Sequence, residues 1–399
     1  MPIMPEIAVI ALWLSLAACG DGSTAGAVSR EAIPLMPAVA RPDTAFTFAQ
    51  TRDSRGRIVT LLVTRLRQDI VQAVDLTRFG GPLDRDVFDV ISMVGAEGLA
   101  AASHATTARR YGVQELLPAG GNGVRHVATG TNFREQARDD EIYETFNSPK
   151  FGRATPARTS VTLEPGALLD YEVEICARFD RDIESAADFD AARKGFFLCG
   201  DFTDRAKLMR LVNPNDVEFR PGFIDAKSAM GFFPTGPFLV VPRDWRSFVR
   251  AERVTAQVNG VLRQDARGGE MMLDFRGIVE KALSSSGTST YAYRGASMPL
   301  LADGKIMQGS AVMSGTSPGV IFMPPQAGDY LAGGARYIFA GPMFRGETAQ
   351  LVMIDGFIEK ERLAGRYLRA GDVVSHRSSS MGDITVRVVS STAATRPSR

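Results

Sequence analysis

The sequence predicts an α+β fold built around many short strands. From His126 onward, short apolar segments alternate with turns rich in Gly and Pro, a spacing that favours a mixed, β-rich core over regular βαβ repetition. Before that point, extended and helical patterns are mixed, which predicts a smaller α+β domain over residues 46–125. A chain of 399 residues is long enough for both units.

Short apolar segments bounded by turn residues mark the candidate strands. These are Ile58–Val63, Val124–Ala128, Leu168–Ala177, Phe196–Asp201, Pro237–Val241, Thr255–Val258, Val312–Ser314, Ala349–Ile354 and Ile384–Val389. Apolar residues at helical spacing predict helices over Asp84–Tyr111, Asp188–Lys194, Arg205–Leu211 and Leu273–Leu283. The glycine-rich turn at residues 119–123 matches neither a phosphate-binding loop nor a dinucleotide fingerprint, so no ligand is assigned to it.

Composition restricts the class of partner. A 45% hydrophobic share with 23% charged residues is typical of a globular protein. The formal charge is only +1, so overall electrostatics do not favour a nucleic acid. We therefore expect a small or local partner.

The N-terminal segment is typical of an export signal. The apolar run Ile7–Ala18 is too short to cross a bilayer comfortably, and it ends in Leu-Ala-Ala-Cys-Gly, which resembles a bacterial lipobox. We expect residues 1–18 to be a signal peptide, Cys19 to carry a lipid and residues 19–45 to form a flexible tether. Such a protein would be periplasmic and would meet the membrane only through its lipid. Residues 1–6 carry no Lys or Arg, so a cytoplasmic protein with an apolar leader is the alternative. Residues 391–399 are expected to be a disordered tail.

Two glutamates on one strand are the strongest chemical signal in the chain. In an extended strand, residues two apart share a face, so Glu172 and Glu174 aim their carboxylates at one region. Asp201 supplies a third carboxylate on another apolar strand. Like charges held this close need a cation, a shared proton or open water. Hard oxygen ligands suit Mg²⁺, Mn²⁺ or Ca²⁺. The alternative is an exposed edge strand with outward-facing acids.

Two cysteines lie close to these acids in the sequence. Cys176 follows Glu174 by two residues, and Cys199 precedes Asp201 by two. If the two strands pair antiparallel with Glu174 opposite Asp201, Cys176 falls opposite Cys199. An exported protein can keep a disulfide. Directly opposed residues reach bonding distance only in close pairs, so two buried free thiols are the favoured interpretation.

An ordered series of motifs resembles the fumarylacetoacetate hydrolase family. The series covers residues 126–390 and consists of Gly130–Phe133, Glu172–Glu174, Leu198–Arg205, Lys227–Ser228, Phe233–Phe238, Val258–Gln264, Ser314–Val320, Ala370–Val374 and Met381–Gly382. The resemblance implies a mixed β-roll with a small N-terminal domain, a homodimer, and a Mg²⁺ or Mn²⁺ ion held by two glutamates and an aspartate.

The resemblance also implies roles for single residues of this chain. Glu172, Glu174 and Asp201 would hold the ion. Arg205 matches an arginine near the substrate, Lys227 a lysine of the catalytic pocket, and Thr316, beside Gly315, a threonine whose hydroxyl meets a substrate carboxylate. A surface ion pair, a solvated lysine and an ordinary turn hydroxyl are the respective structural alternatives.

The chain departs from the family at the lid. Hydrolytic members carry a His–Glu pair that activates water, whereas this chain has Gln136 at the histidine position and Asp139 at the glutamate position. An amide cannot accept a proton near neutral pH, so Asp139, or Glu135 as a fallback, would have to act on water. In Ser148-Pro149, the residue before the proline also differs from the lysine of many relatives.

Three functions therefore follow from the sequence. The first is a metal-dependent hydrolase that cleaves a C–C bond in a small anionic 2-oxo or 1,3-dicarbonyl acid. The second is a lyase of the same superfamily (a hydratase, sugar-acid dehydratase or decarboxylase), which Gln136 favours because such reactions depend mainly on enolate stabilisation. The third is a lipid-anchored binding module without turnover.

Overall fold

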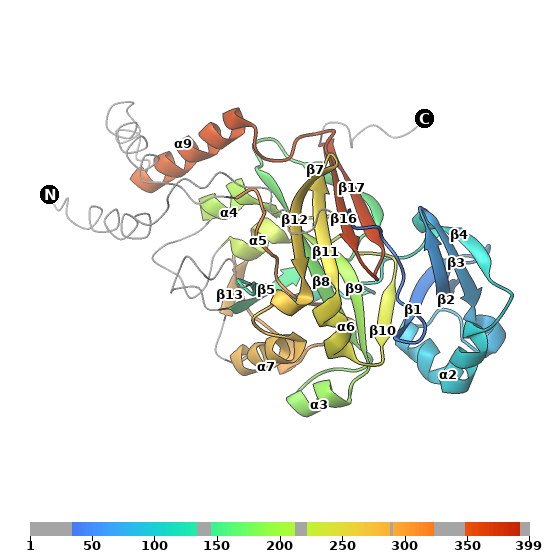
Figure 1. Ribbon diagram of the computed structural model, residues 1–399. Helices are drawn as coiled ribbons and strands as arrows, with labels where there is room; N and C mark the ends of the chain where they lie inside the picture. Colours follow the sequence, from blue (N-terminus) through green and yellow to red (C-terminus); the bar gives the residue numbers. More distant parts are fainter. Residues whose placement is uncertain (1–33, 134–144, 212–221, 288–289, 323–347, 392–399) are drawn as a thin grey trace.

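The computed structural model describes residues 34–133, 145–211, 222–287, 290–322 and 348–391, and these form a strand-rich α+β fold (Figure 1). The largest sheet has ten strands, in the spatial order β4 (Arg109–Gly112), β3 (Ile70–Asp75), β2 (Ile58–Arg67), β1 (Ala45–Arg52), β10 (Leu239–Pro242), β9 (Lys194–Asp204), β8 (Leu169–Phe179), β15 (Val312–Met313), β5 (Arg125–Gly130) and β6 (Phe146–Phe151). The predicted α+β class is confirmed.

A second sheet packs against the first. It has the order β12 (Val261–Arg267), β11 (Arg253–Val258), β16 (Val373–Ser378), β17 (Asp383–Ser390) and β7 (Arg158–Leu163). Strand β11 contacts β8, and strands β16 and β17 contact β9 (Figure 1). A separate hairpin joins β13 (Thr290–Tyr293) to β14 (Ala296–Pro299). The central strands β8 and β9 are therefore covered on one face by another sheet.

Helices lie around these sheets. They are α2 (Val87–Ser103), α3 (Ala186–Ala191), α4 (Arg205–Leu211), α5 (Phe223–Lys227), α6 (Trp245–Ala251), α7 (Phe275–Ser285) and α9 (Ala349–Ala364). Helix α2 begins where the Asp86 side chain accepts a hydrogen bond from Phe88 N, and it buries its apolar face beside β1 and β2. It ends well before the predicted Tyr111, because residues 109–112 pair with β3 as an edge strand. No helix in the described ranges is long and apolar enough to cross a membrane.

The N-terminal strands continue the same sheet that carries the acidic residues. Strand β1 pairs antiparallel with β10, and β10 pairs with β9. Strands β8 and β9 are buried along almost their whole length. One face of β8 presents Tyr171, Val173 and Ile175 to the main apolar core. The opposite face is therefore left for the polar side chains.

The prediction of a strand over Ala349–Ile354 is wrong, because these residues open helix α9. Thr348 caps the helix by accepting a hydrogen bond from Leu351 N, and Gly365 ends it with a left-handed φ of 62°. The apolar pattern continues beyond Ile354 to Phe357 and Ile358, which are buried beside α4. A six-residue apolar window is too short to distinguish a strand from the start of such a helix.

The expected register of β8 and β9 is also wrong, by two residues. Asp201 lies opposite Glu172, while Glu174 lies opposite Cys199 and Cys176 opposite Phe197. Cys176 and Cys199 are nevertheless joined by a disulfide, with their Cα atoms 5.9 Å apart. They are diagonal neighbours on one face of the strand pair. The prediction of two free thiols considered only directly opposed residues and so did not allow for a bond between diagonal ones.

We expect removal of this disulfide to lower the free energy of unfolding by about 3 kcal/mol, because it closes a loop of 23 residues in the unfolded chain. The variant is Cys176→Ala/Cys199→Ala, measured by urea denaturation without reductant. Wild-type protein in dithiothreitol is the control and should show a similar loss. Peptide mapping that recovers both cysteines as free thiols from unreduced protein would contradict the assignment.

His376 should make the fold sensitive to acid. Its ring is fully buried, has no hydrogen-bond partner among the described residues and lies against Gly200. Burial lowers the pKa of His376 to about 3. As the pH falls below about 6.5, His376 becomes protonated in the unfolded chain but stays neutral in the folded chain. The free energy of unfolding therefore decreases.

The expected contribution of His376 is a loss of about 1.4 kcal/mol per pH unit between roughly pH 6 and pH 4. His376→Phe should show a shallower slope in urea denaturation across this range. His104 is exposed at the end of α2, so His104→Phe is the matched control and should keep the wild-type slope. Equal slopes for His376→Phe and wild type would refute the assignment.

Candidate metal centre

Three carboxylates converge between the two central strands. Glu172 and Asp201 are directly opposed, and Glu174 follows Glu172 on the same face of β8. One carboxylate oxygen from each residue lies within 4.8 Å of the other two such oxygens. All three side chains are buried. The structure thus brings together the acids that the sequence analysis selected, and it contradicts the alternative of an exposed edge strand.

Two predicted cations reach this cluster. Lys227, at the end of α5, donates from Nζ to Glu172 Oε2 at 2.9 Å and to Asp201 Oδ2 at 2.7 Å. Arg205 opens α4 directly after β9, so its guanidinium extends back over β8 and donates to Glu172 Oε1 at 2.8 Å. Both side chains are more than nine-tenths buried. Neither the surface ion pair nor the solvated lysine considered above describes them.

A third cation was missed by the sequence analysis. Lys150 lies on β6, and its Nζ donates to Asp201 Oδ1 and to the backbone carbonyl of Lys227, both at 2.6 Å. Its side chain is 1% exposed. The available signal was a lone lysine directly after Pro149, inside a segment that departs from the family pattern. Only the fold shows that this lysine reaches the acids.

Asp170 was also missed, although strand alternation places it on the same face as Glu172. Its Oδ2 accepts a hydrogen bond from Arg205 Nε at 3.0 Å and another from the backbone of Phe322. Its Oδ1 accepts from the backbone of Ile321 at 3.0 Å. Asp170 is fully buried. Asp170 therefore fixes the orientation of Arg205 and links that side chain to the backbone of residues 321–322.

Glu174 has the least compensated charge of the three acids. Its described hydrogen bond is from Gly315 N to Oε2, at 2.8 Å. Gly315 has a φ of 80°, and a Cβ there would lie 2.9 Å from Thr129 O, so a glycine is required for this contact. Burial, followed by the negative charges of Asp201 and Glu172, raises the pKa of Glu174 well above its usual value.

The neighbouring ions respond differently because they have partners. Burial alone would raise the pKa of Asp201, but the ammonium groups of Lys150 and Lys227 outweigh it and lower that pKa. Burial alone would lower the pKa of Lys227, but Asp201 and Glu172 outweigh it and raise that pKa. Asp201 is therefore a carboxylate, and Lys227 an ammonium ion, at neutral pH.

The donor set fits a hard divalent cation. Three buried carboxylate oxygens within one ion's reach are the ligands preferred by Mg²⁺, Mn²⁺ and Ca²⁺. Glu174 has no ion-pair partner of opposite charge within the part of the chain that the structure describes. A divalent ion between the three acids would offset its charge, so the residues present are suited to hold one.

Thr316 lies beside this centre, but its hydroxyl is already engaged. It accepts a hydrogen bond from Gln264 Nε2 at 2.8 Å and donates to Val173 O at 3.3 Å. A substrate carboxylate can only accept, so at Thr316 it would have to take the hydrogen bond that the hydroxyl now donates to Val173 O. The predicted lid residues Gln136 and Asp139, with Glu135, lie outside the described residues, as does Cys19.

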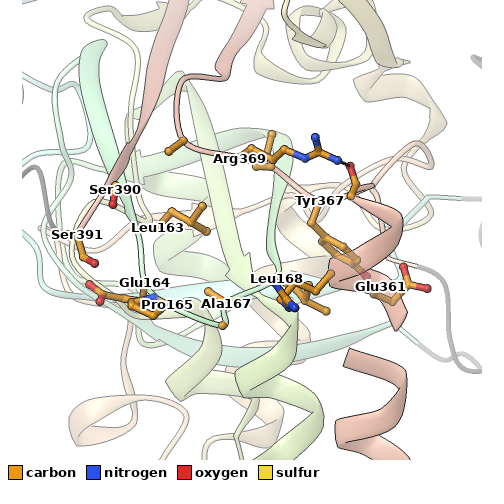
Figure 2. A pocket seen from close by; sticks show the side chains of 15 residues that line it. Leu163, Glu164, Pro165, Ala167, Leu168, Glu361, Tyr367, Arg369, Ser390 and Ser391 are labelled. Atoms are coloured by element: carbon orange, nitrogen blue, oxygen red, sulfur yellow. Dashed lines mark hydrogen bonds between the residues drawn. The ribbon is translucent and has the colours of Figure 1, made fainter. Parts of the chain in front are cut away.

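A separate pocket of about 290 Å³ lies between the β7–β8 turn and the end of α9 (Figure 2). None of the three carboxylates lines it. Three of its four charged side chains have partners, since Glu361 accepts from Arg366 Nε at 3.0 Å, Arg362 donates to Glu359 Oε1 at 2.7 Å and Arg369 donates to Gly365 O at 2.9 Å. We therefore assign the chemistry to the carboxylate cluster.

Comparison with known proteins identifies the C-terminal part of the chain. Residues 118–389 match the family model described as fumarylacetoacetate (FAA) hydrolase C-terminal. A search of curated proteins found no match. Similar solved structures include an HpcE protein from Mycobacterium smegmatis, with 20% identity and a TM-score of 0.53 over 86% of this chain and 99% of that one.

Another similar structure is the fumarylacetoacetate hydrolase of the psychrophilic Exiguobacterium antarcticum. It has 17% identity and a TM-score of 0.51, over 86% of this chain and 99% of that one. At such low identities the similarity shows a common fold.

We expect the loss of any one acid of the cluster to weaken Mn²⁺ binding by more than about 100-fold, since the loss of outer contacts alone commonly costs roughly 10–100-fold. Glu174→Gln is the sharpest variant because its carboxylate has no competing lysine. The measurement is isothermal titration calorimetry on chelator-treated protein. Glu361→Gln removes a buried carboxylate from the other pocket and should leave affinity unchanged. Wild-type affinity in Glu174→Gln would contradict the site.

Proposed function

Since this chain belongs to the fumarylacetoacetate hydrolase family, we propose that it is a divalent-metal-dependent hydrolase that cleaves a C–C bond in a small 2-oxo or 1,3-dicarbonyl acid. The observation that carries this proposal is the convergence of Glu172, Glu174 and Asp201 on one buried point, with Lys227 and Arg205 beside them. A small anionic carbonyl compound is the substrate class that such a mixture of charges would accept.

Glu172, Glu174 and Asp201 would hold the ion, Mg²⁺ or Mn²⁺ in the first place and Ca²⁺ as an alternative. When bound, such an ion polarises a substrate carbonyl and stabilises negative charge on its oxygen. The remaining steps belong to the protein's own side chains.

Lys227 would stabilise the oxygen on which negative charge develops. Asp201 and Glu172 keep its ammonium group protonated, and it is held in a buried site where charge acts strongly. Arg205 would orient the anionic end of the substrate through its planar guanidinium group. Its hydrogen bonds to Asp170 and Glu172 fix the position of that group. Thr316 and Gly315 would border the same region, with the Thr316 hydroxyl exchanging a protein contact for a substrate oxygen.

Activation of water is the step for which the chain lacks the usual histidine. Asp139 would have to orient or deprotonate water, with Gln136 able only to donate or accept a hydrogen bond. This substitution favours a second candidate function, a lyase acting on a 2-oxo acid as a hydratase, sugar-acid dehydratase or decarboxylase. Such a reaction would need the same ion, Lys227 and Arg205. Dehydration and decarboxylation use no water nucleophile, and hydration adds water to a double bond that the neighbouring carbonyl activates, without breaking a C–C bond.

The setting of the reaction is part of the same proposal. The lipobox-like segment before Cys19 supports a periplasmic, lipid-anchored protein, with a cytoplasmic protein as the alternative. A homodimer is proposed on the strength of the family resemblance.

Purified protein with Mg²⁺ or Mn²⁺ should convert an acylpyruvate into two carboxylic acids, because cleavage between the carbonyls adds one water across the C–C bond. Products are identified by NMR, with chelator-treated protein as the control. Gain or loss of water, or release of CO₂, from a 2-oxo acid in place of two acids would identify a lyase. Tight binding of all tested acids without conversion would identify a binding module.

Gln136→His distinguishes a weakened hydrolase from a lyase. If the amide limits water activation, this variant should cleave acylpyruvates about 10²–10⁴-fold faster, the size expected for a positioned base. Gln136→Asn changes the same position without adding a base and should give no gain. An unchanged rate in Gln136→His would count against hydrolysis limited by the lid.

A further inference from the structure

We propose that Lys150 is a built-in cation that weakens divalent-metal binding at the carboxylate cluster and leaves Asp201 only one oxygen to offer to the ion. This inference rests on the metal site proposed above and concerns a residue to which the family pattern gives no role. It predicts a site that needs a higher metal concentration than its three acids alone would require.

The first argument is geometric. Lys150 Nζ lies 2.6 Å from Asp201 Oδ1, while Lys227 Nζ lies 2.7 Å from Asp201 Oδ2. Both oxygens of this acid are therefore engaged by ammonium groups. Lys150 also donates to the backbone carbonyl of Lys227 at 2.6 Å, which links the two lysines through a second, independent contact.

The second argument is that Lys150 cannot readily move away. Its side chain is 1% exposed, and its Nζ lies 5.8 Å from the centre of the Phe233 ring. An ammonium ion without partners in such surroundings would be strongly destabilised. Lys150 therefore stays on Asp201 Oδ1, and an ion that uses Asp201 must take Oδ2 and displace the contact from Lys227.

The third argument is charge. The site holds four acidic side chains, those of Asp170, Glu172, Glu174 and Asp201, and three basic ones, those of Lys150, Lys227 and Arg205. A metal ion would replace the proton that burial favours on Glu174, so all seven groups are counted as charged in the metal-binding state. Together they would leave one negative charge. Without Lys150 there would be two, which a divalent ion neutralises. Lys150 thus offsets one of the charges that attract the metal, and it does so at short range in a buried site, where screening is weak.

The test is Mn²⁺ affinity in metal-free protein, measured by calorimetry and by electron paramagnetic resonance of free Mn²⁺. Lys150→Met keeps an unbranched side chain one atom shorter than lysine and removes its charge. We expect Mn²⁺ to bind at least about tenfold more tightly, because one repulsive charge is lost. Lys150→Gln, which keeps a hydrogen-bond donor for Asp201, should also bind more tightly and serves if the methionine variant does not fold.

Lys305→Met is the matched control. It removes a lysine charge at a partly exposed ion pair with Asp182 and should leave the affinity unchanged. Binding of Mn²⁺ by the Lys150 variants but not by wild type would support the proposal. Equal or weaker binding in both Lys150 variants, or binding in none of the proteins, would overturn it.

The titration requires no turnover, so it separates this inference from the proposed function. Tighter binding in a protein that converts no carbonyl acid would leave the role of Lys150 intact. Turnover with unchanged affinity in the Lys150 variants would refute that role alone.

Discussion

The pairing of β8 with β9 is the constraint on which the rest of the site depends. This buried, antiparallel pair places Glu172 opposite Asp201 and carries Glu174 one step further along the same face. A shift of one residue would turn every acid to the opposite face, into the main apolar core. Burial of the apolar residues Tyr171, Val173 and Ile175 on the other face therefore helps to fix this register, together with the hydrogen bonds between the strands.

Burying several acids together is unfavourable unless cations accompany them. Each cation comes from a different element: Lys150 from β6, Lys227 from α5 and Arg205 from α4. Their hydrogen bonds cover both oxygens of Asp201 and both oxygens of Glu172. Glu174 is left as the acid whose negative charge the described residues do not balance, so it is stable there only with a proton, which its raised pKa favours, or with a positive ligand beside it.

The same contacts connect the site to the chain around it. Asp170 joins Arg205 to residues 321–322, and Gly315 joins Glu174 to the segment that follows β15. Lys150 lies in β6 and donates to Asp201 from there.

Local sequence patterns determined much of this protein. Strand alternation was enough to place Glu172 and Glu174 on one face, because its period of two depends only on the backbone. The boundaries of α4 and the approximate extents of β8 and β9 also followed from local apolar patterns and turn residues. The ordered motifs identified the family, which the match over residues 118–389 bears out.

Only the tertiary structure shows features that involve two segments distant in the sequence. The pairing partner of Asp201, the Cys176–Cys199 disulfide and the reach of Lys150 all require knowing which strands lie side by side and in what register. The helix at Ala349 was settled by packing of Phe357 and Ile358 beside α4, since its first six residues suit either conformation. The local sequence determines which side chains share a face of a strand or helix, because that depends only on the backbone conformation. Long-range packing determines which charged side chains lie close together in the fold.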